Sequence, residues 1–296
     1  MTAGHGDRIG ELVRGPDLSI SFEFMPPRDQ AGAEQLWQAI QELERVQPTF
    51  VSVTYGAGGT TRDTTVEITG RIARETSLRA MGHLTCVGHT RAELIDVLDA
   101  YTAVGVDNIL ALRGDPKEGP RAPWTSTEGG LTRACELVEL VREVGDFSVG
   151  VAAFPEGHPS AESLDADARV LAAKAAAGAE FAVTQLFFRV EDYLTLVGRV
   201  HALGVDIPIL PGIMPITNLG SINRMAELSG AVIPAEVLAR FDGLSEPADV
   251  RRVGVSVATE LCRRLLDAGA PGLHFFTLNR SRATLEIFEG LQLRPG

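Results

Sequence analysis

Hydrophobic and polar positions along the chain follow two alternating patterns. Short runs rich in β-branched and aromatic residues indicate strands, and longer stretches with apolar residues every three to four positions indicate helices. In residues 33–46, for example, Leu36, Ile40 and Leu43 share one helical face. The predicted strands are 18–24, 49–55, 80–86, 107–113, 147–153, 180–188, 207–213 and 272–278.

The first predicted strand separates polar from apolar side chains. Ser19, Ser21 and Glu23 point one way, and the apolar residues between and after them point the other. If helices cover the apolar face, the polar face looks into a barrel or crevice, with Glu23 at its mouth. A carboxylate held there is costly unless it is hydrogen-bonded, paired or used in chemistry.

The order of the elements predicts the fold. About eight strand–helix units in 296 residues match the size and order of a (β/α)₈ TIM barrel. We therefore predict one α/β domain over residues 1–296, with an N-terminal segment at 1–16 and the barrel at 17–290. A doubly wound open sheet is the alternative. Four predicted helices end on a glycine that is followed by an apolar residue and the next strand: Gly105, Gly178, Gly204 and Gly269.

Composition and charge limit the partners. The formal net charge of −12 argues against nucleic acid, because phosphate contacts need a basic face. We expect no membrane span and no secretory signal, since the long apolar runs that these require are missing from the sequence. Three widely spaced cysteines give no disulfide framework. These features favour a cytoplasmic protein that binds small molecules or nucleotides.

Candidate chemistry gathers at the carboxyl ends of the predicted strands, where barrel enzymes place their active sites. The opposite strand ends carry no comparable group of polar residues, and this asymmetry indicates an enzyme. The polar residues and loops at the carboxyl ends are Glu23, Thr54, 56–61, Arg113, Asp115, Glu156, His158, Gln185, 211–218, Asn279 and Arg280.

Each of these features also has a structural interpretation. Glu23 is either a general acid kept protonated by a partly apolar pocket or a carboxylate that caps a loop. The glycine-rich loop 56–61 offers N–H groups to a phosphate or carboxylate, but it matches no nucleotide fingerprint and is equally typical of a tight turn. Gln185, beside an aromatic patch, suits the amide-like edge of a planar ring or a satisfied core position.

Two further groups of polar residues have both a structural and a functional interpretation. His83 and Cys86 lie an odd number of positions apart in a strand and so face opposite ways, which predicts no metal site and leaves His83 to bond a ligand. Arg113 and Asp115 form either a local ion pair or a cation and a carboxylate around a heteroaromatic ligand, with Gly114 admitting that ligand to the backbone. No lysine lies at a predicted strand end, which disfavours a Schiff-base aldolase.

Eight motifs that run in order from about residue 19 to residue 280 carry a family resemblance. They are SFEFMPP at 21–27, VTYGAGGTTRD at 53–63, HLTC at 83–86, ALRGD at 111–115, AFPEGHP at 153–159, TQLFF at 184–188, PGIMP at 211–215 and HFFTLNR at 274–280. With them the chain resembles methylenetetrahydrofolate reductase, in the bacterial form that consists of the catalytic barrel.

This resemblance implies reduction of 5,10-methylenetetrahydrofolate to 5-methyltetrahydrofolate by NAD(P)H, with NADH the donor expected for the bacterial form. It implies that Glu23 is the general acid that opens the imidazolidine ring to a 5-iminium cation, and that Asp115 contacts the pterin and favours this cation. Gln185 would bind folate and then nicotinamide, and Arg280 would bind folate carboxylates. The positions implied for FAD are Thr54, His83, Leu112, Arg113, Gly114, His158, Asp167 and Lys174, together with Phe154.

The departures from the family pattern cluster on the flavin side. Phe154 replaces a tyrosine, and Val170 and Ala173 stand where an asparagine and a basic residue are usual. The loop WTSTEGGL at 124–131 also differs from the helix start of flavin-binding members. Each lost polar contact costs about 1 kcal/mol or more, so several together weaken FAD binding by orders of magnitude.

We therefore hypothesise direct hydride transfer from NADH to the folate iminium, with the nicotinamide where the flavin ring would otherwise stack. One alternative is the same reaction through bound FAD with ping-pong kinetics. Another is a folate- or nucleotide-binding barrel without turnover, against which the intact Glu23, Asp115 and Gln185 argue.

Overall fold

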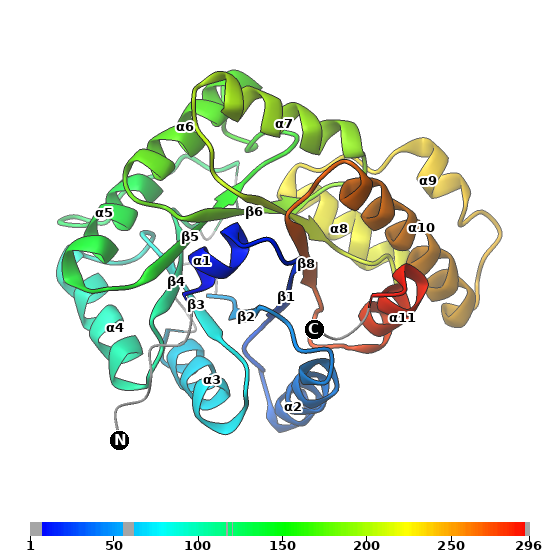
Figure 1. Ribbon diagram of the computed structural model, residues 1–296, viewed down its shortest axis with the longest axis horizontal. Helices are drawn as coiled ribbons and strands as arrows, with labels where there is room; N and C mark the ends of the chain where they lie inside the picture. Colours follow the sequence, from blue (N-terminus) through cyan, green and yellow to red (C-terminus); the bar gives the residue numbers. More distant parts are fainter. Residues whose placement is uncertain (1–7, 56–61, 117, 120, 294–296) are drawn as a thin grey trace.

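Eight parallel strands close into a single barrel in the computed structural model, which describes residues 8–55, 62–116, 118–119 and 121–293 (Figure 1). Each strand pairs with the next in sequence, and the last pairs with the first. The strands are β1 Ser19–Phe24, β2 Phe50–Val53, β3 Ala80–Thr85, β4 Asn108–Leu112, β5 Ser148–Ala153, β6 Phe181–Leu186, β7 Ile209–Ile213 and β8 Gly272–Phe276.

The predicted (β/α)₈ barrel is confirmed, and every strand falls within its predicted range. The open-sheet alternative is wrong, because β1 and β8 are hydrogen-bonded neighbours with Ser21 opposite His274 and Glu23 opposite Phe276. Closure brings residues from the two ends of the chain side by side. This pairing determines what surrounds Glu23.

Apart from the first helix, the helices form an outer layer around the strands (Figure 1). Among the described residues, none of these helices is both long and apolar enough to cross a membrane. The four glycines predicted to end helices all have positive φ, as expected. The helices are α1 Ile9–Arg14, α2 Gln30–Glu44, α3 Arg62–Glu75, α4 Arg91–Ala103, α5 Ala134–Val144, α6 Leu164–Ala176, α7 Val190–Ala202, α8 Leu219–Ser229, α9 Ala235–Ala239, α10 Pro247–Asp267 and α11 Arg282–Leu291.

The alternation predicted for β1 determines its packing. Phe22 lies on the outer face, where its ring is 6.0 Å from both Phe275 and Phe288, between the strands and α11. Ser21 and Glu23, on the other face, contact side chains inside the barrel. The apolar outer face packs on helices, so the polar face is left for the interior.

Helix α1 closes the end of the barrel where the strands begin, and it lies at the centre of the ring of strands (Figure 1). Ile9 and Val13 are buried among interior side chains that include Phe50 and Phe181. This helix falls in residues 1–16, which the sequence predicts only as a segment that precedes the barrel. The amino-terminal opening is thus filled, and the opposite rim is where the predicted site residues lie.

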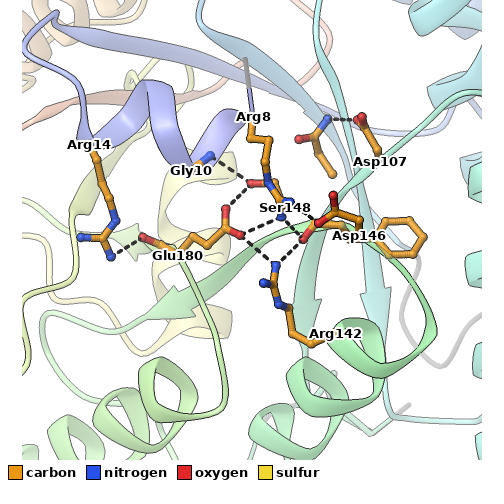
Figure 2. A network of polar contacts seen from close by, with 10 residues as sticks. Arg8, Gly10, Arg14, Asp107, Arg142, Asp146, Ser148 and Glu180 are labelled. Atoms are coloured by element: carbon orange, nitrogen blue, oxygen red, sulfur yellow. Dashed lines mark hydrogen bonds and ion pairs between the residues drawn. The ribbon is translucent and has the colours of Figure 1, made fainter. Parts of the chain in front are cut away.

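A polar network holds α1 in place (Figure 2). Glu180 accepts hydrogen bonds from Arg8 at 2.9 Å, Arg142 at 3.0 Å and the hydroxyl of Ser148 at 2.6 Å. The N–H of Gly10 donates to Ser148 Oγ at 3.0 Å. A side chain at Gly10 has no room, because its Cβ would lie 2.0 Å from the Glu180 carboxylate.

Candidate active site

Glu23 lies at the carboxyl end of β1 with its side chain directed into the barrel and only 16 % exposed. Its Oε2 is 3.6 Å from Nε2 of His83 on β3 and 3.6 Å from Nε2 of His274 on β8. The structure therefore places this carboxylate at the inner end of the site, against two imidazole rings. His83 was a predicted site residue, and His274 was not.

Burial sets the protonation state of His83. Its ring is 4 % exposed, and this burial lowers its pKa from 6.5 to about 4. The Glu23 carboxylate opposes the shift, and the neighbouring His274 ring adds to it. At neutral pH His83 is an uncharged ring that can donate or accept a hydrogen bond.

The loop after β8 fixes the backbone around Glu23. Thr277 donates from its hydroxyl to the Glu23 carbonyl at 2.7 Å. Asn279, 7 % exposed, accepts from the N–H of Met25 and donates to its carbonyl, both at 2.8 Å. Asn279 sits in the left-handed region with φ 57°, a conformation that asparagine tolerates better than most residues. Arg280 follows directly and is exposed on the rim.

A second group gathers at the ends of β4 and β5. Arg113 Nη2 lies 3.4 Å from Nε2 of His158, and the same nitrogen of His158 lies 3.9 Å from the Asp115 carboxylate. Asp115 is 49 % exposed and so is open to a ligand. Trp124 covers this group: its indole N–H donates to the Gly114 carbonyl at 3.2 Å, and the Arg113 guanidinium lies 5.5 Å from its ring centroid.

Gly114 is needed for this turn. Its φ of 78° is strained for other residues, and a Cβ would lie 2.5 Å from the Val87 side chain. The chain can therefore turn sharply at the rim between Arg113 and Asp115. Leu112, the last residue of β4, is partly buried just before the turn.

Helix α6 brings a buried pair of charges to the same side of the barrel. Lys174 is 7 % exposed and donates to the Ala152 carbonyl at 2.8 Å. Burial lowers the pKa of Lys174 to about 8, with Asp167 opposing the shift. Burial likewise raises the pKa of Asp167, against the effects of Lys174 and His158. The two side chains could bind a polar group of a ligand, although the Lys174 ammonium already donates one hydrogen bond to the β5 backbone.

Gln185 stands at an irregularity of β6. The pairing with β7 shifts between Val183 and Leu186, and Thr184 bridges the shift by accepting from the Gly212 N–H at 2.8 Å. The amide oxygen of Gln185 accepts from the backbone N–H of Leu186 at 2.8 Å. The irregularity thus fixes the direction in which Gln185 leaves the strand.

Several other predicted residues can be placed. Thr54 follows β2, and its carbonyl accepts from the Thr65 hydroxyl at 3.0 Å. Phe154 packs edge-on against His158, with ring centroids 4.8 Å apart at 80°. Glu156 is engaged elsewhere, since it accepts from the Val232 N–H at 3.0 Å and burial raises its pKa. The loop 56–61 lies outside the described residues.

The interpretation of His83 and Cys86 as residues on opposite faces agrees with the structure. His83 faces Glu23 inside the barrel, whereas Cys86 donates weakly to the Arg133 carbonyl at 3.5 Å on the helix side. Burial raises the pKa of the Cys86 thiol to about 12. Within the part of the chain that the structure describes, no group of three His, Cys, Asp or Glu side chains is placed to hold a metal ion.

Sequence reasoning missed His274 and the contacts of Trp124. A signal existed for His274, because in a closed barrel the last strand must pair with β1. His274 then lies opposite Ser21, two positions before Phe276, which lies opposite Glu23. Its neighbours on β1, Ser21 and Glu23, are predicted to face the interior. No comparable signal existed for Trp124, which reaches Gly114 from an irregular loop.

Known proteins resemble this chain over nearly all of its length. The family model described as methylenetetrahydrofolate reductase matches residues 8–292. Over 280 residues the chain is 40 % identical to the 5,10-methylenetetrahydrofolate reductases of Pectobacterium carotovorum subsp. carotovorum and of Escherichia coli (strain K12), which covers 94 % of this chain and 91 % and 92 % of theirs.

More distant similarities agree with this match. The chain is 36 % identical over 299 residues to "Methylenetetrahydrofolate reductase (NADH) 1" of Arabidopsis thaliana, covering 97 % of this chain and 50 % of that protein. A solved structure of an uncharacterized protein from Clostridium thermocellum, described as binding two copies of 5-methyl-5,6,7,8-tetrahydrofolic acid, matches with a TM-score of 0.61 and 13 % identity. It covers 93 % of this chain and 94 % of that chain, and the likeness shows the fold alone.

Proposed function

This chain belongs to the methylenetetrahydrofolate reductase family and is an oxidoreductase of that kind, and from this premise we propose that it passes hydride directly from NADH to the folate substrate. The observation that carries the proposal is the contrast between the two sides of the site. Glu23, Asp115 and Gln185 are all present in the sequence, while several of the residues expected to hold a flavin are changed or already bonded within the chain.

The chemistry proposed for the substrate side uses three side chains. Glu23 donates its proton to the nitrogen that leaves as the five-membered ring of methylenetetrahydrofolate opens, which generates the 5-iminium cation. Asp115 lies near this cation and stabilises its positive charge. The nicotinamide of NADH then gives a hydride to the iminium carbon, so that NAD⁺ and 5-methyltetrahydrofolate are formed and the proton and electron pair balance. Gln185 and Arg280 hold the folate.

The contacts of Trp124 disfavour binding of a flavin at this site. Family resemblance assigns Arg113 and Gly114 to FAD, yet the indole of Trp124 bonds the Gly114 carbonyl and lies beside the Arg113 guanidinium. His158 is also engaged, since its Nδ1 lies 3.1 Å from the Ser160 N–H and its Nε2 faces Arg113. A flavin would have to displace these contacts to use the same groups.

The side chains of Phe154 and α6 point to the same conclusion. Phe154 has no hydroxyl to donate, and its ring packs on His158. Val170 is 51 % exposed and Ala173 is also exposed, so this face of α6 presents apolar side chains where polar ones are usual in the family. Lys174 donates to a backbone carbonyl. These residues fit a flavin poorly, which supports direct transfer.

The flavin question is tested by NADH oxidation with methylenetetrahydrofolate, with FAD added or omitted. We expect the purified protein to turn over without FAD and its rate to stay unchanged when FAD is added. A rate that depends on FAD would overturn direct transfer and leave the family reaction in place.

The role of Glu23 is tested in the same assay with the variant Glu23→Gln. The amide keeps the size of the carboxyl but cannot donate its proton, so turnover should fall by roughly two to four orders of magnitude with little change in substrate binding. Wild-type turnover in this variant would refute Glu23 as the general acid.

A further inference from the structure

Two buried imidazoles face one oxygen of Glu23 without a close hydrogen bond. The Nε2 atoms of His83 and His274 each lie 3.6 Å from Glu23 Oε2. Within the described part of the chain, neither nitrogen has a hydrogen-bond partner. An unpaired buried polar group costs about 1–3 kcal/mol, so its retention calls for a physical reason.

The contacts of Ser21 are the basis for assigning the tautomer of His274. Its Oγ is 2.8 Å from Nδ1 of His274 but 3.5 Å from the Leu273 carbonyl. We assign the hydroxyl hydrogen to the shorter contact, with Nδ1 of His274. In that tautomer Nδ1 is the acceptor and Nε2 is the donor, and Nε2–H points toward Glu23.

The ring of His274 is also held from the sides. Phe50 of β2 stacks on it with ring centroids 6.0 Å apart, and Phe276 packs edge-on at 5.4 Å. His274 is 0 % exposed. Among the described residues packed around it, the titratable groups facing the ring are Glu23 and His83. The imidazole therefore cannot swing away from the carboxylate.

We propose that Ser21 and His274 are positioning residues that hold Glu23 for proton donation, an inference that rests on the general-acid role proposed for Glu23. His274 donates to Oε2 and leaves Oε1 to carry the proton that goes to the opening ring. As Glu23 becomes a carboxylate, the 3.6 Å separation closes to a charge-assisted hydrogen bond, as catalytic hydrogen bonds often do only when charge develops. His83 offers a second donor from β3.

The test compares turnover and its pH dependence in His274→Leu, which keeps an apolar side chain in the space and removes the donor. We expect kcat to fall roughly ten- to a hundredfold, the effect of losing one hydrogen bond to a developing charge, while KM for both substrates stays within about twofold. The alkaline limb of the kcat profile should move to higher pH, because the ionised form of Glu23 loses a donor. His274→Gln, which can still donate, should recover part of the rate.

A matched control separates this role from simple packing. His89 is also 4 % exposed, but its ring bonds the Val87 carbonyl at 2.9 Å and the Tyr55 hydroxyl at 3.2 Å instead of Glu23. His89→Leu should lower stability without moving the pH profile. An equal shift of the profile in both variants would overturn the proposal.

A double-variant cycle identifies the route of the effect. If His274 acts through Glu23, His274→Leu should cost less than about twofold in the Glu23→Gln background, measured by single-turnover NADH oxidation. The full ten- to hundredfold loss in that background would overturn the positioning role. Wild-type turnover in Glu23→Gln alone is a separate result, because it would refute the general acid itself.

Ser21→Ala gives a second, milder test that removes no ring. Without the Ser21 hydroxyl, the hydrogen of the His274 ring can lie on either nitrogen, so Nε2 donates to Glu23 only part of the time. The value of kcat should therefore fall, and the alkaline limb should move in the same direction as in His274→Leu, by a smaller amount. Wild-type kcat and an unchanged profile in Ser21→Ala would contradict the assignment even where His274→Leu does not fold.

Discussion

Replacing His83 with glutamine should make the protein less sensitive to acid. Burial lowers the pKa of this imidazole from 6.5 to about 4 in the folded chain, with Glu23 opposing the shift and His274 adding to it. Between these values the unfolded chain binds a proton that the folded chain does not. The free energy of unfolding therefore falls as the pH falls through this window.

The two pKa values give the size of the effect. Relative to pH 8, the wild-type protein loses about 2 kcal/mol at pH 5 from this one group, and the loss approaches about 3 kcal/mol near pH 4. Glutamine has a similar reach and remains neutral, so His83→Gln does not suffer this loss. The variant should be somewhat less stable than wild type at pH 8 and closer to it, or more stable, at pH 5.

Urea unfolding at pH 8 and pH 5 measures the difference. His201 on α7, whose side chain is 58 % exposed, serves as the matched control, and His201→Gln should keep the wild-type pH dependence. If His83→Gln and wild type lost the same free energy between the two pH values, the argument from burial would be wrong.

Two other substitutions test the supports at the two ends of the barrel. Gly10→Ala forces Glu180 away from its partners, because the new Cβ would lie 2.0 Å from the carboxylate. The free energy of unfolding, measured in urea, should fall by about 1–3 kcal/mol while KM stays the same. An unchanged free energy of unfolding would show that the packing of α1 contributes little to stability. Asn279→Ala removes both hydrogen bonds to Met25 and places alanine in a left-handed conformation, so it should lower stability by about 1–3 kcal/mol and reduce kcat as Glu23 is released. Asn279→Asp keeps the acceptor and should be intermediate, whereas wild-type kcat in both variants would contradict a role in holding Glu23.

The fold was predictable because its signals are local and repeated. Alternation in 18–24 separated Ser21 and Glu23 from the apolar residues that pack on the helices, and the structure places both inside the barrel. The glycines at helix ends marked the units along the chain. Helix α1 could not be predicted because it has only six residues. Its two buried apolar side chains, Ile9 and Val13, are too few to show a helical period.

The site was only partly predictable, because its contacts join distant segments. Glu23 could be placed from its own strand, but its contact with His274 depends on barrel closure across 251 positions of sequence, between residues 23 and 274. The Trp124 contact with Gly114 depends on the path of an irregular loop, for which the sequence has no periodic signal. The local sequence pattern thus indicates which residues lie at the ends of strands. Closure of the barrel then determines which of these residues contact one another.

The initial-velocity pattern of the purified protein tests direct hydride transfer most directly. NADH and methylenetetrahydrofolate are varied together in protein whose visible spectrum has been recorded. Direct transfer requires both substrates on the enzyme at once, so double-reciprocal plots should intersect and the spectrum should lack flavin absorbance. Parallel lines, with a flavin spectrum that NADH bleaches, would mean that the cofactor is reduced before folate reacts and would contradict the account.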